Sequence, residues 1–594
     1  MPSHSSSVRR RPIALASTIA ALLACNFAAR AANKTWDGGS GVDSAWLTAA
    51  NWDLDAAPVS NDALIFAGAT RLGPVNDFAA NGLFNGITFN AGAGAFTLSG
   101  NAITLTTGLT GAAGAVTGGN ATNNSTSTET VNLPVAFGAG NHTFVTAASS
   151  GALNFSGALT RAANATAVFT KNGGNINFAG SGLANDASGI LGGWAVIGND
   201  FATLDGGGNI AAYAAYTPIA AGAITSGATF NYKYSAESAN LTVADGTTIN
   251  SLVTTISAAR SLTISGTMRL GTKGGIYRTG TSTANSVMTV TGGTLTANGG
   301  GEITLACATN TAANFAATNN NLSVASVIAN DGGNAVSVNV IGYVVMSGAN
   351  TFTGGTFINQ GRVQASNVSA FGVGGVVTVN PGAEAFLNNN GTFANPFVIA
   401  GIGATEASGG QQLGAVSGGV AISGGGKLQA TAEITSARVF TLGAGGGTID
   451  TNGNDVTLDA NSTVTGTTLT KIGSGALTLA GIQTYATLNA NGGTTHVESA
   501  LGTGASTVNV SANIDFSVSQ TLAALNIADG AVAAFGPATS PAPAPDLLAA
   551  AAVPEPGSLG LLMLGALGIL GRRPPRGNVN AIAGRVSYGP TFTR

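Results

Sequence analysis

One short pattern, an apolar residue followed by a threonine and a second apolar residue, returns along most of this chain. It occurs at Phe96-Thr97-Leu98, Ile103-Thr104-Leu105, Leu241-Thr242-Val243, Leu262-Thr263-Ile264, Ile303-Thr304-Leu305, Phe440-Thr441-Leu442, Val456-Thr457-Leu458 and Leu477-Thr478-Leu479. Because side chains alternate across a strand, each triplet places its apolar residues on one face and its threonine on the other. β-Branched residues also suit a pleated surface. The pattern predicts many short strands.

The segments between the triplets carry turn residues rather than a helical pattern. Residues 297–301 and 451–455 are rich in Gly and Asn, which favour tight turns. No 3.6-residue apolar periodicity appears between about residues 60 and 530. The chain is therefore expected to be all-β, with residues 61–536 forming one continuous β-solenoid rod. At roughly 20 to 25 residues per coil, this body would contain on the order of 20 coils.

Composition restricts the classes of function. The net charge is −3, and the basic residues gather near the two ends, so the body lacks the cationic excess that binds a phosphate backbone. A hydrophobic content of 44% with low net charge also argues against disorder. Of the two cysteines, Cys25 lies in the N-terminal segment and Cys307 in the body. An internal disulfide is therefore not expected.

The first 31 residues have the pattern of a secretory signal peptide. Arg9, Arg10 and Arg11 precede an apolar run, and Ala29 and Ala31 flank Arg30 in an A-x-A arrangement. Cleavage after Ala31 is expected, so that the exported chain begins at Ala32. An alternative is that Leu22-Leu23-Ala24-Cys25 acts as a lipobox and Cys25 becomes the lipidated N-terminus.

Residues 32–60 are rich in tryptophan. Trp36, Trp46 and Trp52 precede the first triplet, and large aromatic side chains can cover the exposed end of a solenoid, which requires a cap. We therefore expect a capping segment. Carbohydrate stacking on the same three rings is the alternative.

Two longer segments repeat one another and suggest a family. Gly348 corresponds to Gly481, and Phe352 corresponds to Tyr485, in Val344–Gly355 and Leu477–Tyr485. The second segment follows Thr470-Lys471-Ile472-Gly473-Ser474-Gly475, and the similar Thr170-Lys171-Asn172-Gly173-Gly174 precedes residues 176–180. These segments resemble the autotransporter-associated β-strand repeat. The resemblance implies a right-handed parallel β-helix displayed at the cell surface.

The C-terminal region resembles a second family. Val553-Pro554-Glu555-Pro556 precedes an apolar segment that begins at Leu559, and Arg572, Arg573 and Arg576 follow it. This arrangement in residues 553–576 resembles the PEP-CTERM sorting signal of Gram-negative bacteria. The resemblance implies an exosortase partner that processes the chain near Pro-Glu-Pro.

The apolar segment from Leu559 to Leu570 is shorter than the roughly 20 residues of a permanent membrane helix. It is therefore expected to be a short helix that holds the chain in the inner membrane only until processing, with the three arginines on its cytoplasmic side. Residues 537–552 form a Pro/Ala linker that spaces the body from the membrane, and residues 577–594 form a tail. Permanent anchorage by an unprocessed segment is the alternative.

The acidic residues and histidines do not form a recognisable catalytic pattern. The densest acids are Asp450, Asp455 and Asp459, and Asp200 and Asp205 bracket a short predicted strand. Turn positions explain both sets, although a calcium site is the alternative for the first set. His142 and His496 lack metal-ligand spacing and are expected to be solvated strand residues. The sequence predicts no catalytic residue, no metal site and no cofactor.

These features together favour an exported, non-enzymatic protein of the cell surface or extracellular matrix. A structural or adhesive solenoid associated with exopolysaccharide or biofilm is the expected function. The alternative is a polysaccharide lyase or hydrolase on the same scaffold, which would need paired carboxylates along one face.

Overall fold

The computed structural model describes residues 32–106, 120–219, 223–235, 239–279, 286–308, 321–400, 404–407, 413, 418–502 and 505–536. Within them, the predicted triplets form short strands with alternating burial. Ile103–Leu105 and Val456–Leu458 bury both apolar residues, while the threonine between them is less buried. Helical structure in these residues is limited to the 3-10 turns η1 (Ala49–Asn51) and η2 (Asp53–Asp55). The all-β prediction is confirmed, and the fold is a β-solenoid of about 19 turns.

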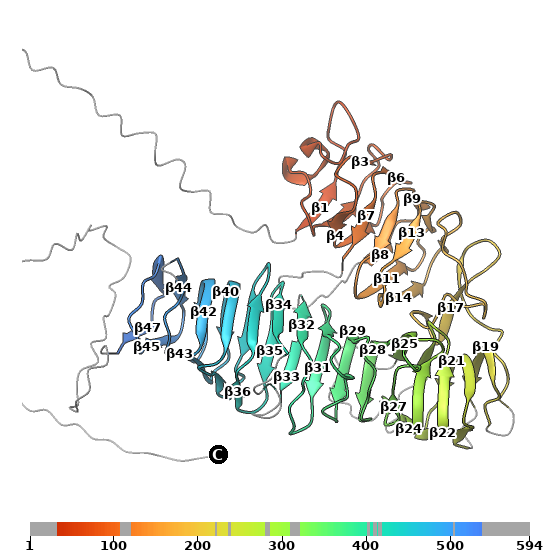
Figure 1. Cartoon of the computed structure of the whole chain (residues 1–594). Coiled ribbons are helices and arrows are strands. Elements are labelled where there is room, and N and C mark those ends of the chain that lie inside the picture. The colour runs from red at the N-terminus through yellow and green to blue at the C-terminus, as the bar shows by residue number, and fades with distance from the viewer. Residues whose placement is uncertain are drawn as a thin grey trace, which may run out of the picture. The chain divides into compact units, whose positions relative to one another are not determined.

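The first part of the solenoid has three sheets (Figure 1). The first sheet contains β1 (Asn33–Trp36), β2 (Ala63–Phe66), β5 (Gly86–Phe89), β8 (Asn120–Asn123), β11 (Asn141–Thr146), β14 (Thr166–Lys171), β16 (Ala195–Ile197), β17 (Asp200–Leu204) and β18 (Ile210–Ala212). The second contains β4 (Gly82–Phe84), β7 (Ile103–Leu105), β10 (Val135–Phe137) and β13 (Leu159–Arg161). The third contains β3 (Val75–Asn76), β6 (Thr97–Gly100), β9 (Glu129–Val131), β12 (Leu153–Phe155) and β15 (Ile176–Asn177). We call this the first stack.

Parallel pairing between successive coils places like residues above one another. Phe66 of β2 pairs with Phe89 of β5, and Phe144 of β11 pairs with Phe169 of β14. The Phe144 and Phe169 rings stack with centroids 5.2 Å apart. Since a parallel ladder repeats at about 4.8 Å, identical aromatic residues in one row come into ring contact. Phenylalanine therefore fills much of the first core.

Tryptophans close the N-terminal end of this stack. Trp36, Trp46 and Trp52 are fully buried and contact Phe66 with ring centroids 5.9–6.3 Å apart. The Trp52 indole N–H donates to the Trp46 carbonyl oxygen at 2.8 Å. Buried rings offer no face for stacking on a carbohydrate, so the geometry favours the capping interpretation over the carbohydrate alternative.

The parallel stack is interrupted by β16, β17 and β18. β17 pairs antiparallel with both β16 and β18. Trp194, just before β16, is buried in the first core, and its indole N–H donates to the Leu191 carbonyl oxygen at 2.7 Å. The reversal of strand direction ends the first stack, because a parallel coil cannot continue from an antiparallel edge.

A second stack follows, with its own core. Its larger sheet contains β19 (Gly227–Tyr234), β20 (Leu241–Val243), β21 (Thr247–Thr255), β22 (Arg260–Leu270), β23 (Gly275–Thr279), β24 (Met288–Ala297), β25 (Gly301–Cys307), β26 (Leu322–Val324), β27 (Val327–Ile328), β28 (Val336–Met346), β29 (Thr356–Ala365), β30 (Val377–Val379), β31 (Ala383–Leu387), β32 (Phe397–Ala400), β33 (Ala404–Ala407), β34 (Val420–Ser423), β35 (Gly426–Ala430), β37 (Val439–Leu442), β38 (Gly447–Asp450), β40 (Thr463–Ile472), β42 (Ile482–Ala490), β44 (Thr507–Val510) and β46 (Ala524–Ile527). Its smaller sheet contains β36 (Ile434–Ser436), β39 (Val456–Leu458), β41 (Ala476–Leu479), β43 (Thr494–Val497), β45 (Asn513–Phe516) and β47 (Val532–Phe535). The repeat pattern predicted one continuous stack, whereas the described residues form two stacks in series.

Several long strands of the second stack pass from one face of a coil to the next at a glycine. Gly342 of β28 and Gly361 of β29 are ladder partners, and both have φ of +82°. A Cβ at Gly361 would lie 2.4 Å from the Gly342 carbonyl oxygen. These positions therefore exclude a side chain both by backbone conformation and by the close approach of the neighbouring coil.

We predict that Gly361→Ala destabilises the second stack by more than Gly332→Ala. Gly332 also has positive φ, but no atom lies within 4 Å of its added Cβ. Gly332→Ala should therefore cost only the left-handed strain of about 1–2 kcal/mol, and Gly361→Ala should cost about 1–3 kcal/mol more from the clash. Urea unfolding of both variants measures the difference. Equal losses would mean that the coils separate easily at this corner.

Candidate functional site

The acids singled out in the sequence serve local structure. The Lys427 ammonium lies 3.2 Å from Asp450 Oδ2, the Ala476 N–H donates to Asp455 Oδ1 at 2.9 Å, and the Asn461 N–H donates to Asp459 Oδ1 at 2.8 Å. No group of three or more His, Cys, Asp or Glu among the described residues could hold a metal ion. Asp455 and Asp459 lie beside turns on either side of β39, as the turn interpretation expects, whereas Asp450 is the last residue of strand β38.

Asp200 and Asp205 each bind different partners. The predicted short strand is present as β17, but Asp200 is its first residue rather than a turn residue, and it pairs with Lys233 at 2.6 Å. Asp205 accepts the N–H groups of Asn209 at 2.9 Å and Gly207 at 2.8 Å. These hydrogen bonds lower the pKa of Asp205, because they stabilise the carboxylate. Such an acid remains ionised and is a poor proton donor.

The two histidines differ from each other. His142 of β11 is fully buried, its Nε2 lies 2.9 Å from the Gly138 carbonyl oxygen, and its ring stacks on Phe137. The prediction of a solvated His142 was wrong, because the residue lies on the inward row of the strand. His496 of β43 is partly exposed, and its Nδ1 lies 2.6 Å from Asp515 Oδ2 on the next coil.

Glu129 is a buried acid that the sequence analysis did not identify. Its carboxyl group accepts the Ser125 hydroxyl at 2.5 Å and the Phe96 N–H at 2.8 Å. Burial raises the pKa of Glu129, while these two hydrogen bonds act in the opposite direction. The residue connects neighbouring coils and is enclosed by the first stack, so it has no access to a substrate.

A charged cluster joins the two stacks. The Arg161 guanidinium lies 2.9 Å from Glu302 Oε2 and sits 4.8 Å from the centre of the Trp194 ring. The Asn164 N–H donates to Glu302 Oε1 at 3.1 Å. Arg161, Trp194 and Glu302 line part of a pocket of about 410 Å³. The Arg161 and Glu302 side chains are mostly buried and paired with each other. The cluster therefore links the first stack to the second.

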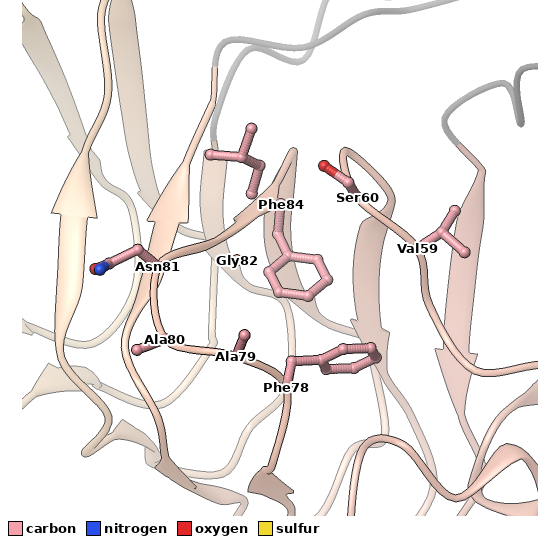
Figure 2. Close-up of a pocket in the computed structure, with 9 residues that line it drawn as sticks. Val59, Ser60, Phe78, Ala79, Ala80, Asn81, Gly82 and Phe84 are labelled. Carbon is pink, nitrogen blue, oxygen red and sulfur yellow. The ribbon is translucent and has the colours of Figure 1, made fainter.

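An apolar pocket of about 280 Å³ lies on the first stack, lined by Val59, Ser60 and residues 78–84. Figure 2 shows the Phe78 and Phe84 rings side by side, with the Asn81 amide pointing away from them. Their ring centroids lie 5.9 Å apart in an edge-to-face arrangement. Ser60 and Asn81 are the polar side chains of this lining, so the pocket cannot supply acid–base chemistry.

Buried cations hold the turns of the second stack. The Lys471 ammonium donates to the carbonyl oxygens of Gly473, Gly475 and Gly492, each at 2.7 Å, and to the Thr451 hydroxyl at 3.0 Å. Burial lowers the pKa of Lys471 to about 8, so the ammonium is still mostly protonated at pH 7. Its partners come from three successive coils. Lys471 therefore links neighbouring coils through its hydrogen bonds.

Arg438 has a similar position. It is fully buried, and its guanidinium donates to the carbonyl oxygens of Asn395, at 2.9 Å, and Phe393. Burial lowers the pKa of Arg438 to about 10. No pattern in the sequence indicates this role, because an isolated arginine between short strands does not predict a buried position.

The two repeated segments lie on different faces of their coils, because residues 344–346 belong to β28 of the larger sheet and residues 477–479 to β41 of the smaller sheet, but their glycines have similar surroundings. A Cβ at Gly348 would lie 2.2 Å from the Ser326 carbonyl oxygen, and a Cβ at Gly481 would lie 2.1 Å from that of Ser462. Phe352 and Tyr485 are both buried. The matched glycines are therefore needed where adjacent coils approach most closely.

The predicted sorting and signal residues lie outside the described part of the chain. They are Ala29, Ala31, Val553, Pro554, Glu555, Pro556, Arg572, Arg573 and Arg576. The short C-terminal helix and the linker, residues 537–552, also lie outside it. No helix among the described residues is long and apolar enough to cross a membrane.

Comparison with known proteins identifies one family feature. Residues 552–576 match the family model of the PEP-CTERM protein-sorting motif. No curated protein and no solved structure matches the chain. The motif implies sorting by an exosortase and export to the cell envelope or surface of a Gram-negative bacterium.

We predict that Lys471→Met destabilises the second stack by about 1–3 kcal/mol. The substitution keeps most of the side-chain volume but leaves buried carbonyl oxygens without their donor. Lys171→Met is the matched control, because Lys171 has the corresponding place in the similar segment but is exposed. The control should change the free energy of unfolding by less than about 0.5 kcal/mol. Equal effects in urea unfolding would contradict the fastening role.

Proposed function

We propose that this chain is a structural or adhesive protein of the cell surface or extracellular matrix, whose solenoid is a non-enzymatic body. The observation that carries the proposal is the sorting motif at residues 552–576 on the same chain as a β-solenoid. A sorting motif directs the chain to a location outside the inner membrane, and a solenoid forms a long surface from few residue types. Both features fit a protein that works by its surface.

The acids and histidines add support for a non-enzymatic body. The acidic residues discussed above occupy turns, ion pairs or the enclosed core, and Lys233, Lys427 and Arg161 neutralise three of them. A polysaccharide lyase or hydrolase on this scaffold would need two carboxylates facing one open groove. No pair of these acids is arranged in that way, which favours the structural function.

We propose the following route to the surface. The signal peptide is removed after Ala31, and the apolar segment that follows Pro556 holds the chain in the inner membrane, with Arg572, Arg573 and Arg576 on the cytoplasmic side. The exosortase then cuts near Val553-Pro554-Glu555-Pro556. The body is released outward, together with residues up to the cut.

The surface of the body suits contact with exopolysaccharide. Asn489, Asn509 and Asn526 lie in one row on successive coils. The Asn509 amide donates to Asn489 Oδ1, and the Asn526 amide donates to Asn509 Oδ1, each at 2.8 Å. Amides and hydroxyls on a surface of low charge can exchange hydrogen bonds with sugar hydroxyls. We also propose that Val344–Gly355 and Leu477–Tyr485 are autotransporter-associated repeats, supported by the close approach of Gly348 and Gly481 to a serine carbonyl group of the preceding coil.

We predict that wild-type protein recovered from its own cells ends within residues 552–576, in surface or medium fractions. Glu555→Ala should instead give chains that reach Arg594 in the membrane fraction, because the exosortase no longer acts on them. C-terminal peptide analysis by mass spectrometry measures both. Thr591→Ala in the tail is the control and should be processed normally. Wild-type peptides that reach Arg594, found only in membranes, would instead show a permanent anchor.

The adhesive part of the proposal predicts retention of the exported body on exopolysaccharide from the same cells. Retention should be lost when the soluble polysaccharide is added as a competitor, and a column of unrelated dextran should not retain the body. Release of reducing sugars during the same incubation would favour the enzymatic alternative. Passage through the column without retention would contradict the adhesive role.

A further inference from the structure

The last coil of the second stack is built differently from the coils before it. The larger sheet ends at β46 and the smaller sheet ends at β47. β44 and β45 alternate buried residues with less buried ones, whereas β46 and β47 contain no buried residue. Among the described residues, no strand pairs with the outer edge of either. This end of the core is therefore open.

Large apolar side chains lie on this end. Phe535 is 59% exposed and Val532 is 46% exposed, although the Phe535 ring stacks on Phe516 with centroids 5.1 Å apart. A further set of partly buried residues packs against the core here: Leu522, Leu525, Ile527, Ala531 and Ala533. The N-terminal end of the first stack, by contrast, is closed by three buried tryptophans. An uncovered core end of this kind needs a cap for solubility.

The polar groups of the end are also arranged for a further layer. Asn526 is the last rung of the amide row, and its side-chain N–H donates to Asn509 Oδ1 at 2.8 Å. The outer backbone groups of β46 and β47 form two more rows. An open edge of this kind pairs readily with another strand unless the protein blocks it.

We propose that residues 537–551 of the same chain form the cap of this end, with Leu547 and Leu548 packed on Val532 and Phe535. The segment begins where the apolar face lies, directly after Phe535 and Gly536. Eleven residues from Pro537 to Leu547, at about 3.1 Å each, provide about 30 Å of chain. This length allows the segment to cross the end of a coil and turn back, so that Leu547 reaches Phe535.

The composition of the segment suits a cap that stops the stack. Pro537, Pro541, Pro543 and Pro545 lack a backbone N–H, so the segment can cover the edge but cannot continue the ladder as a regular strand. Leu547 and Leu548 then supply the apolar side chains that the open core lacks. A cap of this composition also prevents pairing with another edge strand.

The covalent connection favours this segment, over a second copy of the chain, as the occupant of the open end. A short covalent connection gives an effective concentration in the millimolar range, which exceeds the concentration of free copies under ordinary conditions. The segment therefore occupies the face first. This inference concerns residues before the sorting motif, so it stands whether or not the exosortase processes the chain.

The test compares the full chain with Leu547→Asp/Leu548→Asp. Loss of the cap should raise hydrogen-exchange rates in β46 and β47 at least tenfold and make the mass from light scattering rise with protein concentration. Thr539→Asp/Ser540→Asp is the matched control, because it adds the same charge to the polar part of the segment. The control should behave as the wild type.

A cross-link gives a second, independent readout. Phe535→Cys/Leu547→Cys should form a disulfide within one chain, which peptide mass analysis detects. A disulfide between two chains, or a wild-type dimer that Leu547→Asp/Leu548→Asp leaves intact, would overturn the proposal in favour of a second copy. Unchanged exchange rates and mass in this variant, with no cross-link, would overturn it in favour of a bare end.

Discussion

The structure depends on the parallel ladder between successive coils. Each coil places its short strands over those of the coil before, so the apolar residues of a triplet meet like residues in the next layer. Phe144 over Phe169 and Leu477 over Val456 are examples. A single coil cannot bury its own apolar face, and stability therefore comes from the contact between neighbours. This explains how a chain rich in Gly, Ala and Thr can hold a core.

The same dependence makes the corners and ends the vulnerable places. At the corners, carbonyl groups of adjacent coils converge and need donors, and buried Lys471 and Arg438 supply them. Where the backbones approach most closely, as at Gly361, a side chain has no room. At the ends, the core is exposed unless other residues cover it. Trp36, Trp46 and Trp52 do so at the start of the first stack.

The described residues place their charged groups in supporting roles, which is consistent with a protein that acts through its surface. Arg161 and Glu302 connect the two stacks, and a small apolar cluster also contains residues of both, with Phe201 of β17 in contact with Tyr277 of β23. The C-terminal sorting motif implies export of the chain, and the solenoid is its folded body. The charged residues described above therefore act mainly in contacts within and between coils.

The sequence by itself determined the fold class and the sorting motif, because both are written in local patterns. An apolar-Thr-apolar triplet has the two-residue period of a strand. The sorting motif is a linear signal that consists of Val553-Pro554-Glu555-Pro556, an apolar segment and three arginines. Only the tertiary structure decided where the stack is interrupted, that His142 and Glu129 are buried, and that Lys471 fastens three coils while Lys171 remains exposed. These outcomes depend on which residue lies one coil above or below. The number of residues between stacked positions changes with the length of each turn, so a local sequence pattern does not predict which residues meet.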